Sequence, residues 1–379
     1  MEHPKPGAVA GFPHHMLREI YEQPEAVAET IRRHVDRDRI FRGELEAIGS
    51  ALAACKRMII AASGSSRHAG LAGEIMIEDL SDMAVDVEYA SEYCYRSTQA
   101  AADSIVMVIT QSGETADTIA ALRAALTRGA STIAISNVAE STIAREANVS
   151  LLSYAGPELA VPATKSFTTQ LTVLFLFALF LAEQRGRIST NDVHRHVSQL
   201  RDLSRALRER IPSWDAQCLA CARQHSAERT FLYLGRGIHY AIAREGALKL
   251  KEISYIHGEG YPAGELKHGP SALIDSQSPV VVLATCDHDD PDSVLRYRKT
   301  LGVMKDVKQE GGKVIAVATE GDSQVLQVAD QAIFVPATTE LLSAILEVVP
   351  LQLFAYHVAV LNGCDVDHPR HLVKAVVRE

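Results

Sequence analysis

The sequence lacks the features of a membrane protein, a secreted protein or a nucleic-acid-binding protein. Its longest apolar run, residues 171–182 (LTVLFLFALFLA), is too short to span a bilayer and predicts a buried helix. The first residues, MEHPKPGAVAGFPHH, lack the apolar core of a signal peptide. Its 6 cysteines are scattered without the spacing of a disulfide framework, which fits a reducing cytoplasm. A net charge of −9 argues against binding to nucleic acid. We therefore expect a cytoplasmic globular protein.

Cys218 and Cys221 form a C-x-x-C pair inside a segment of helical character, DAQCLACARQ. No second cysteine pair or histidine cluster lies near them to complete a zinc site. We favour two buried small residues one helical turn apart, with a metal or redox role as the alternative.

The first half of the chain alternates between short apolar runs and helix-forming segments. The runs predict strands at residues 57–62, 84–89, 104–110, 131–136 and 149–154, followed by a long apolar helix at 165–184. Helix-period segments at residues 15–33 and 36–52 come before them. Alternation of this kind predicts a parallel sheet that is covered by helices on both faces.

The second half repeats this scheme. The whole chain, at 379 residues, is long enough for two complete domains. The strands of the second half are predicted at residues 231–234, 279–285, 313–319 and 332–336, and the segment around Glu340 matches the one around Glu158. The fold class is therefore α/β, with two similar domains in tandem. The predicted divisions are a helical preface (1–48), a first domain (49–187), a helical linker (188–221), a second domain (222–364) and a tail (365–379).

A candidate phosphate site lies at residues 108–118 (VITQSGETADT), where a strand ends in a hydroxyl-rich turn before a helix. Free N–H groups at a helix start attract anions, and Thr110, Ser112 and Thr115 add hydroxyl donors. Gly113 allows close approach of the backbone. With no basic residue in the turn, a small phosphate monoester is favoured over a nucleotide. The alternative is a serine-rich helix cap that binds no ligand.

The equivalent segment of the second half, ATCDHDDPD, is acidic and would repel a phosphate. We therefore expect one phosphate site per chain, in the first domain.

A second candidate segment, residues 244–270 (REGALKLKEISYIHGEGYPAGELKHGP), is dense in ionisable groups. Lys249 and Glu252 lie three residues apart on one side of a predicted helix. A loop rich in glycine and proline follows and carries His268. A carboxylate and a histidine suit proton transfer next to a carbonyl, whereas a solvated charged face is the alternative.

The tail carries Lys374 among Leu372, Val373, Val376 and Val377, which predict that the tail packs onto the domain. A lysine in an apolar setting has a lowered pKa and can form a Schiff base with a keto sugar. A solvated lysine near a frayed terminus is the alternative.

These motifs together resemble one enzyme family. SGSSRHAG, TQSGETADT, ATKSFTTQLTV, ALKLKEISYIHGEGYPAGELKHGP and DVDHPRHLVKAVVRE are similar to the isomerase half of glutamine–fructose-6-phosphate aminotransferase (glucosamine-6-phosphate synthase), and they occur in the same order. That half is a pair of sugar isomerase (SIS) domains, each a flavodoxin-like three-layer sandwich. The resemblance covers residues 15–379.

The resemblance implies a hexose 6-phosphate site between the domains of a homodimer with shared active sites. Ser65, Ser66, Thr110, Gln111, Ser112, Thr115 and Val161 would contact the substrate. Glu252 would move a proton between C1 and C2 with Lys249 beside it. His268 of a partner copy would help to open the sugar ring, and Lys374 would form the Schiff base. No metal or organic cofactor is expected.

Two departures from the family bear on function. The glutaminase domain of the family, with its cysteine after the initiator methionine, is not expected, because Glu2 follows Met1. Pro162 stands in PATK where the synthases usually have ASTK, so a sugar-contacting hydroxyl is lost. The AGPE and ATKSF segments resemble relatives without a glutaminase domain that deaminate glucosamine 6-phosphate.

The expected activity is interconversion of fructose 6-phosphate plus ammonia with glucosamine 6-phosphate, in the deaminating direction. The alternatives are a fructose-6-phosphate/glucose-6-phosphate isomerase, a fructosamine-6-phosphate deglycase, a subunit that receives ammonia from a separate glutaminase, and a non-catalytic sugar-phosphate sensor. The sensor would need the phosphate turn but not Glu252, His268 and Lys374. The sequence leaves open the direction of the reaction, the hexose phosphate used and any allosteric control.

Overall fold

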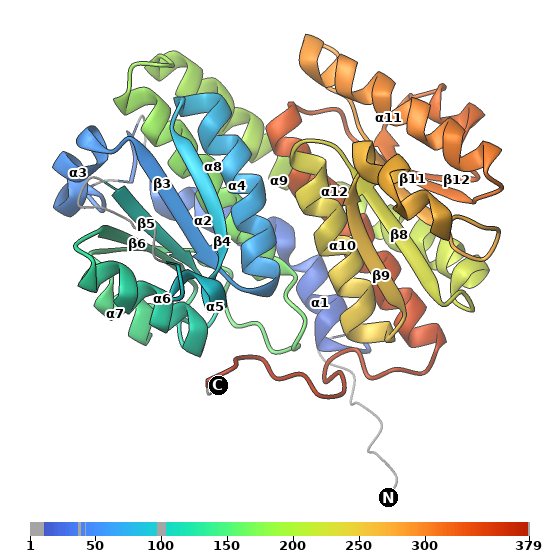
Figure 1. Cartoon of the computed structure of the whole chain (residues 1–379), viewed down its shortest axis with the longest axis horizontal. Coiled ribbons are helices and arrows are strands. Elements are labelled where there is room, and N and C mark those ends of the chain that lie inside the picture. Colours follow the sequence, from blue (N-terminus) through green and yellow to red (C-terminus); the bar gives the residue numbers. More distant parts are fainter. Residues whose placement is uncertain (1–10, 37–38, 42, 97–103, 378–379) are drawn as a thin grey trace, which may run out of the picture. The chain divides into compact units, whose positions relative to one another are not determined.

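The structure, a computed structural model, describes residues 11–36, 39–41, 43–96 and 104–377 (Figure 1). Parts of the predicted preface and the last two residues of the tail lie outside the described residues. The chain divides into two compact units, each built on one sheet. The first-sheet unit comprises residues 25–157, 165–204 and 375–377 of the described chain, and the second-sheet unit comprises 11–24, 158–164 and 205–374.

The first-sheet unit holds five parallel strands in the order β4-β3-β5-β6-β7. The strands are β3 (Arg57–Ala62), β4 (Ala84–Tyr89), β5 (Ser104–Ile109), β6 (Ser131–Ser136) and β7 (Val149–Leu152). The helices are α2 (Gln23–His34), α3 (Gly49–Ala54), α4 (Gly64–Ser81), α5 (Ala90–Tyr93), α6 (Ala116–Thr127), α7 (Thr142–Glu146) and α8 (Lys165–Gln184), with the short elements β1 (Val35–Asp36), β2 (Arg39–Ile40) and η1 (Glu46–Ile48).

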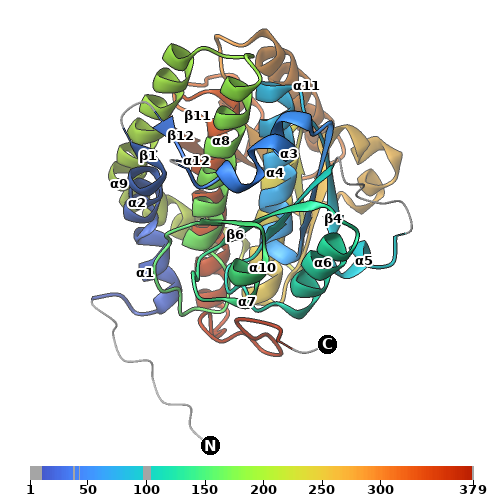
Figure 2. The same ribbon diagram turned by 90° about the vertical axis from the view of Figure 1, so that its left-hand side faces the viewer.

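Alternate residues of the strands face opposite layers of helices, because strand side chains alternate between the two faces. Ile59 and Val106 pack in a core with residues of α5, α6 and α7. On the other face, a Cβ at Gly70 of α4 would lie 2.9 Å from Ile60 Cγ2, so the helix sits close to the sheet. Helices α4 and α8 pack side by side, as Figure 2 shows. The result is a three-layer sandwich.

The second-sheet unit repeats this topology, with parallel strands in the order β12-β11-β10-β8-β9. The strands are β8 (Thr230–Gly235), β9 (His257–Pro262), β10 (Val280–Ala284), β11 (Val314–Thr319) and β12 (Gln331–Val335). The helices are α1 (His15–Tyr21), α10 (Ile238–Ser254), η2 (Ala263–His268), η3 (Pro270–Leu273), α11 (Pro291–Gln309), η4 (Val325–Gln327) and α12 (Glu340–Leu361). The long helix α9 (Thr190–His225) continues from one unit into the other. The predicted α/β fold with two like domains is confirmed.

Strand β9 corrects the prediction of a loop rich in glycine and proline after α10. The segment pairs in parallel with β8 at the edge of the sheet, where Pro262 ends the strand without breaking an inner ladder. Its glycines are there because α10 lies against them. A Cβ at Gly258 would lie 2.9 Å from the Ala247 carbonyl oxygen, and one at Gly260 would lie 2.7 Å from Arg244 Cα.

Residues 36–52 correct a second prediction, since they are not a single helix. The described part of this segment holds β1, β2, η1 and the start of α3. Its helix-like spacing of apolar residues serves instead to bury Ile40, Leu45, Ile48 and Leu52 from short elements.

Cys218 and Cys221 lie in α9 and are both buried, as favoured from the sequence. Desolvation raises the pKa of the Cys221 thiol to about 12 and also raises that of Cys218. Both side chains therefore behave as small apolar residues.

Helices α8 and α12 are long and apolar enough to cross a membrane by length and composition alone. In this fold 89% of the most apolar window of each helix is buried inside the protein. Both therefore have the burial of core helices.

Gly260→Ala tests the docking of β9 on α10. The new methyl group would meet the helix backbone, which cannot move aside as a flexible side chain can, and we expect a loss of about 1–3 kcal/mol in unfolding free energy. Gly302→Ala in α11 is the matched control, because a Cβ there meets no atom within 4 Å. Its helix propensity should make it neutral or stabilising. Urea unfolding of both variants measures the difference; equal effects would contradict the close approach of β9.

Candidate active site

The strand order of the first sheet reverses between β3 and β5, and the candidate phosphate residues follow these two strands. Ala62 and Ile109 are register partners, so the carboxyl ends of the strands lie together. Ser65 and Ser66 lie in the first turn of α4, directly after β3, and the turn 110–115 joins β5 to α6. Ligands of parallel α/β sheets bind at such a reversal point. The structure therefore brings Ser65, Ser66 and the turn 110–115 to one edge of the sheet.

Hydrogen bonds within the turn fix its shape. Thr110 Oγ1 accepts from the Gly113 N–H at 3.2 Å and lies 3.4 Å from Thr115 Oγ1, and Ser112 Oγ accepts from the Glu114 N–H at 3.2 Å. Gly113 has a φ of +71°, and a Cβ there would lie 2.0 Å from Ser141 Oγ. Only glycine fits this position.

Glu114 is the acidic residue of the turn, and its charge is directed to α7. Its carboxylate accepts from the Thr142 N–H at 2.7 Å and from Thr142 Oγ1 at 2.9 Å, and these bonds lower its pKa. The hydroxyl groups of the turn are therefore not used to hold this carboxylate. The turn keeps the neutral donors that the sequence predicted for a phosphate monoester.

In the second-sheet unit, Lys249 and Glu252 of α10 form an ion pair. Lys249 Nζ lies 2.6 Å from Glu252 Oε2 and 3.4 Å from Glu245 Oε1. The Lys249 side chain is 1% exposed. Burial alone would lower its pKa, but the negative charges of Glu252, Glu245 and Glu158 together raise it. Lys249 is therefore a permanent positive charge beside Glu252, whose side chain remains 22% exposed.

Lys374 of the tail is held by a carboxylate that sequence reasoning missed. Its Nζ lies 2.6 Å from Glu158 Oε2 and 2.7 Å from the Ala160 carbonyl oxygen. Glu158 is buried, and its Oε1 accepts from the Thr164 N–H at 3.0 Å. The one available signal was the match of Glu158 to Glu340 in the internal repeat. That match places a carboxylate near the start of the buried helices α8 and α12, one in each half of the chain.

The tail is held by polar contacts and not by its apolar side chains, which corrects the prediction from the sequence. Leu372, Val373, Val376 and Val377 are 41–63% exposed. Besides the Lys374 contacts, the Val376 carbonyl accepts from the Ala116 N–H, at the start of α6, at 3.0 Å.

Val161 and His268 occupy different surroundings within the second-sheet unit. The Val161 N–H donates to the Asp367 carbonyl at 2.9 Å, which ties the segment 158–164 to the tail. His268 ends η2 and is exposed. Among the described residues no hydrogen bond or ion pair joins His268 to Lys249, Glu252 or Lys374. Its role across a partner copy stays a prediction.

The strand order of the second sheet also reverses, between β8 and β10. At this edge the anion is a side chain of the protein itself, the carboxylate of Glu340. The Glu340 carboxylate accepts from Ser293 Oγ at 2.6 Å and from an Arg296 guanidinium nitrogen at 2.8 Å, and lies 2.9 Å from His239 Nε2. Burial would raise the pKa of Glu340, but His239 and Arg296 lower it to about 2. This edge is therefore occupied by a carboxylate, which supports the expectation that only the first domain takes a phosphate.

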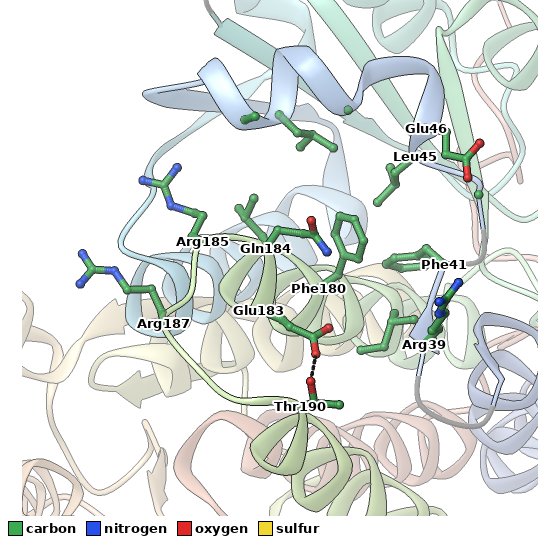
Figure 3. A pocket seen from close by; sticks show the side chains of 16 residues that line it. Arg39, Phe41, Leu45, Glu46, Phe180, Glu183, Gln184, Arg185, Arg187 and Thr190 are labelled. Carbon is green, nitrogen blue, oxygen red and sulfur yellow. Dashed lines mark hydrogen bonds between the residues drawn. The ribbon is translucent and has the colours of Figure 1, made fainter.

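A cavity of about 1020 Å³ lies elsewhere in the first-sheet unit, between residues 39–53 and the end of α8 (Figure 3). Three of its charged side chains have partners within the protein. Arg185 Nε donates to the Ser81 carbonyl at 2.9 Å, Arg187 pairs with Asp82, and Glu183 accepts from Thr190. None of the predicted substrate-binding or catalytic residues lines it.

Glu340→Gln tests the internal anion. Since the folded-state pKa is lowered, the stabilisation is present above about pH 4.5 and is lost as the pH falls toward about 2. We expect the variant to lose about 3 kcal/mol of unfolding free energy at pH 7, and this deficit to shrink below pH 4.5. Denaturant unfolding at several pH values measures it. Glu320→Gln, in an exposed pair with Arg210, is the control and should change little. A deficit that is independent of pH would contradict the network.

Comparisons with known proteins show the family to which the chain belongs. The family model described as "SIS domain" matches residues 51–180 and 225–362. The isomerizing glutamine–fructose-6-phosphate aminotransferase of Chlorobaculum tepidum is 44% identical over 371 residues, which cover 97% of this chain and 59% of that protein. The corresponding enzyme of Bacteroides thetaiotaomicron is 43% identical over 97% of this chain. The chain thus spans about 60% of the length of the curated relatives it matches.

Two solved structures are also similar. The C-terminal domain of glucosamine–fructose-6-phosphate aminotransferase from Francisella tularensis is 34% identical, with a TM-score of 0.88 and 100% of that chain covered. A glucosamine-6-phosphate deaminase from Thermotoga maritima, 22% identical with a TM-score of 0.71, shares the fold. The chain consists of tandem SIS domains and belongs to the family of the C-terminal, isomerase domain of glutamine–fructose-6-phosphate aminotransferase.

Proposed function

We propose that the chain is an aldose–ketose isomerising enzyme that interconverts fructose 6-phosphate plus ammonia with glucosamine 6-phosphate. The observation that carries the proposal is a cluster of charged side chains in the second-sheet unit, made up of Glu158, Glu245, Lys249, Glu252 and Lys374. It contains an amine that can form an imine (Lys374) and a carboxylate base (Glu252) next to a fixed positive charge (Lys249). The names of the relatives that share the fold and the motifs support it.

The proposed roles follow from the chemistry of each group. Ser65, Ser66, Thr110, Gln111, Ser112 and Thr115 bind the phosphate and sugar hydroxyl groups through neutral donors, and Val161 contacts the sugar. An imine between Lys374 and C2 of the open ketose acidifies the protons at C1. Ammonia adds to C2 of this imine and the lysine leaves, so that C2 then carries an imine of ammonia. Glu252 removes a proton from C1 and returns it at C2, while the C1 hydroxyl group loses its proton and the nitrogen gains one. The carbonyl thus ends at C1, and the amine remains at C2 in glucosamine 6-phosphate.

The proposal also gives His268 a role and the reaction a direction. The exposed His268 serves the site of a second copy in a homodimer, where it assists ring opening. The deaminating direction is proposed on the likeness of the AGPE and ATKSF segments to deaminating relatives.

The direct test is incubation of the purified protein with glucosamine 6-phosphate, with ammonia and fructose 6-phosphate measured together. Release of both in equal amounts is the expected result. Conversion of fructose 6-phosphate to glucose 6-phosphate without ammonia would replace the proposal by a simple isomerase. Binding without any turnover would leave a sensor.

Ser112→Ala should raise KM for the phosphosugar by about tenfold or more, because a hydrogen bond to a charged phosphate contributes about 1–3 kcal/mol. Steady-state kinetics of the proposed reaction measure it. Ser213→Ala on the exposed side of α9 is the matched control. An unchanged KM in Ser112→Ala would mean that the phosphate binds elsewhere.

Lys374→Ala should abolish amine-dependent turnover and leave the fold intact, because no other group on the tail can form the imine. Ammonia release and circular dichroism measure the two effects. Lys308→Met, an exposed lysine paired with Asp330, should keep full activity. Full activity in Lys374→Ala would contradict the Schiff-base role.

A further inference from the structure

Glu158 is the buried carboxylate that connects the two lysines of the cluster. Its Oε2 lies 2.6 Å from Lys374 Nζ, and its negative charge is among those that raise the pKa of Lys249. Its side chain is 0% exposed, whereas that of Lys374 is 26% exposed. The lysine thus reaches toward solvent from a carboxylate that is fixed inside the protein.

The segment that carries Glu158 is held from two directions within the second-sheet unit. Glu19 of α1 accepts from the Leu159 N–H at 2.6 Å. Asp367 of the tail accepts from the Met16 N–H at 2.8 Å, and its own carbonyl accepts from the Val161 N–H. Segments 15–19, 158–164 and 365–374, which are distant in sequence, therefore form one hydrogen-bonded assembly around the Lys374 amine.

From this geometry we propose that Glu158 is the positioning residue of Lys374: it holds the amine in place and accepts the protons that the amine must lose. The inference rests on the proposed function, because it assigns a role only if Lys374 forms an imine with a ketose.

Other neighbours cannot take this role. The Ala160 carbonyl, 2.7 Å from Nζ, orients the amine but is not a base. Lys249 carries a raised pKa and stays charged, so it accepts no proton. The ion pair of Glu252 is with Lys249, and no hydrogen bond or ion pair within the described residues joins it to Lys374 Nζ. Glu158 is the carboxylate that directly contacts Lys374 Nζ.

The chemistry balances with Glu158 unchanged at the end. A proton leaves Nζ for the Glu158 carboxylate, and the freed electron pair forms the N–C2 bond while the carbonyl pair moves to oxygen. That oxygen takes up the proton, and a second proton follows the same route from nitrogen. The C–O bond then breaks, water leaves and the nitrogen pair forms the C=N bond. The ammonium and the ketone thus become a protonated imine and water, with Glu158 again a carboxylate.

Glu158→Gln separates this role from support of the loop. The amide oxygen can still accept from the Thr164 N–H, but the side chain can no longer hold an ammonium or accept its proton. Glu19→Gln is the matched control, because Glu19 of α1 is an equally buried carboxylate that holds the same segment through the Leu159 N–H, and the contacts of Lys374 Nζ within the described residues are with Glu158 and Ala160.

The experiment traps the imine with borohydride in the presence of fructose 6-phosphate and follows the mass increase of the peptide that contains Lys374. Trapping in Glu158→Gln should slow by about 100-fold or more, the usual contribution of a general base. Affinity for glucitol 6-phosphate, which has no carbonyl group, should be unchanged in calorimetry. Glu19→Gln should trap at nearly the rate of the unmodified protein.

Equal trapping in Glu158→Gln and the unmodified protein would overturn the inference and leave the proposed function standing. Equal slowing in Glu158→Gln and Glu19→Gln would also overturn it, because the effect would then come from the loop. Absence of trapping and of turnover in the unmodified protein would defeat the proposed function itself. If Glu158→Gln does not fold, Glu158→Asp serves instead: its carboxylate is withdrawn from Nζ, so trapping should slow, and an unchanged rate would overturn the inference.

Discussion

A buried ammonium group can exist in the core of the second-sheet unit only because carboxylates surround it. Lys249 lies within 3.4 Å of Glu245 and Glu252, and Glu158 adds its charge. Removing one partner of such a group costs about 3–5 kcal/mol, since an unpaired charge is left in a medium of low dielectric. The constraint links α10, the segment 158–164 and, through Glu158, the tail with Lys374. The same charges that make Lys249 tolerable fix the groups that the proposed reaction needs.

The two sheets share one topology but differ in the side chains at the edge where the strand order reverses. Both reverse their strand order at the same point, and both have helix starts there. In the first sheet the hydroxyl groups of the turn do not hold the carboxylate of Glu114, because that carboxylate accepts its hydrogen bonds from Thr142. In the second sheet Glu340 is bound by Ser293, Arg296 and His239, so donors that could meet a ligand already hold a carboxylate. This difference is consistent with the proposal that the first-sheet unit binds the phosphate and that the charged groups of the second-sheet unit carry out the proton transfer.

Much of the fold followed from periodicity, because buried parallel strands such as Ile105–Ile109 are continuously apolar and α8 has a clear apolar run. Strand β9 could not be predicted this way, since its glycines are selected by contact with α10 and not by strand propensity. Lys249 and Glu252 were found because helical spacing places them together. Glu158 was missed because its partner Lys374 is far away in sequence, and only the folded tail brings the two within 2.6 Å.

The central claim is that Lys374 binds C2 of a ketose phosphate as an imine and that Glu252 moves a proton between C1 and C2. Incubation of the protein with fructose 6-phosphate in D₂O, followed by proton NMR of the C1 hydrogens, tests it without assuming a direction or a nitrogen donor. The account predicts deuterium at C1 of the recovered fructose 6-phosphate, and no incorporation in Glu252→Gln. Undiminished incorporation in Glu252→Gln, or none in the unmodified protein, would contradict it.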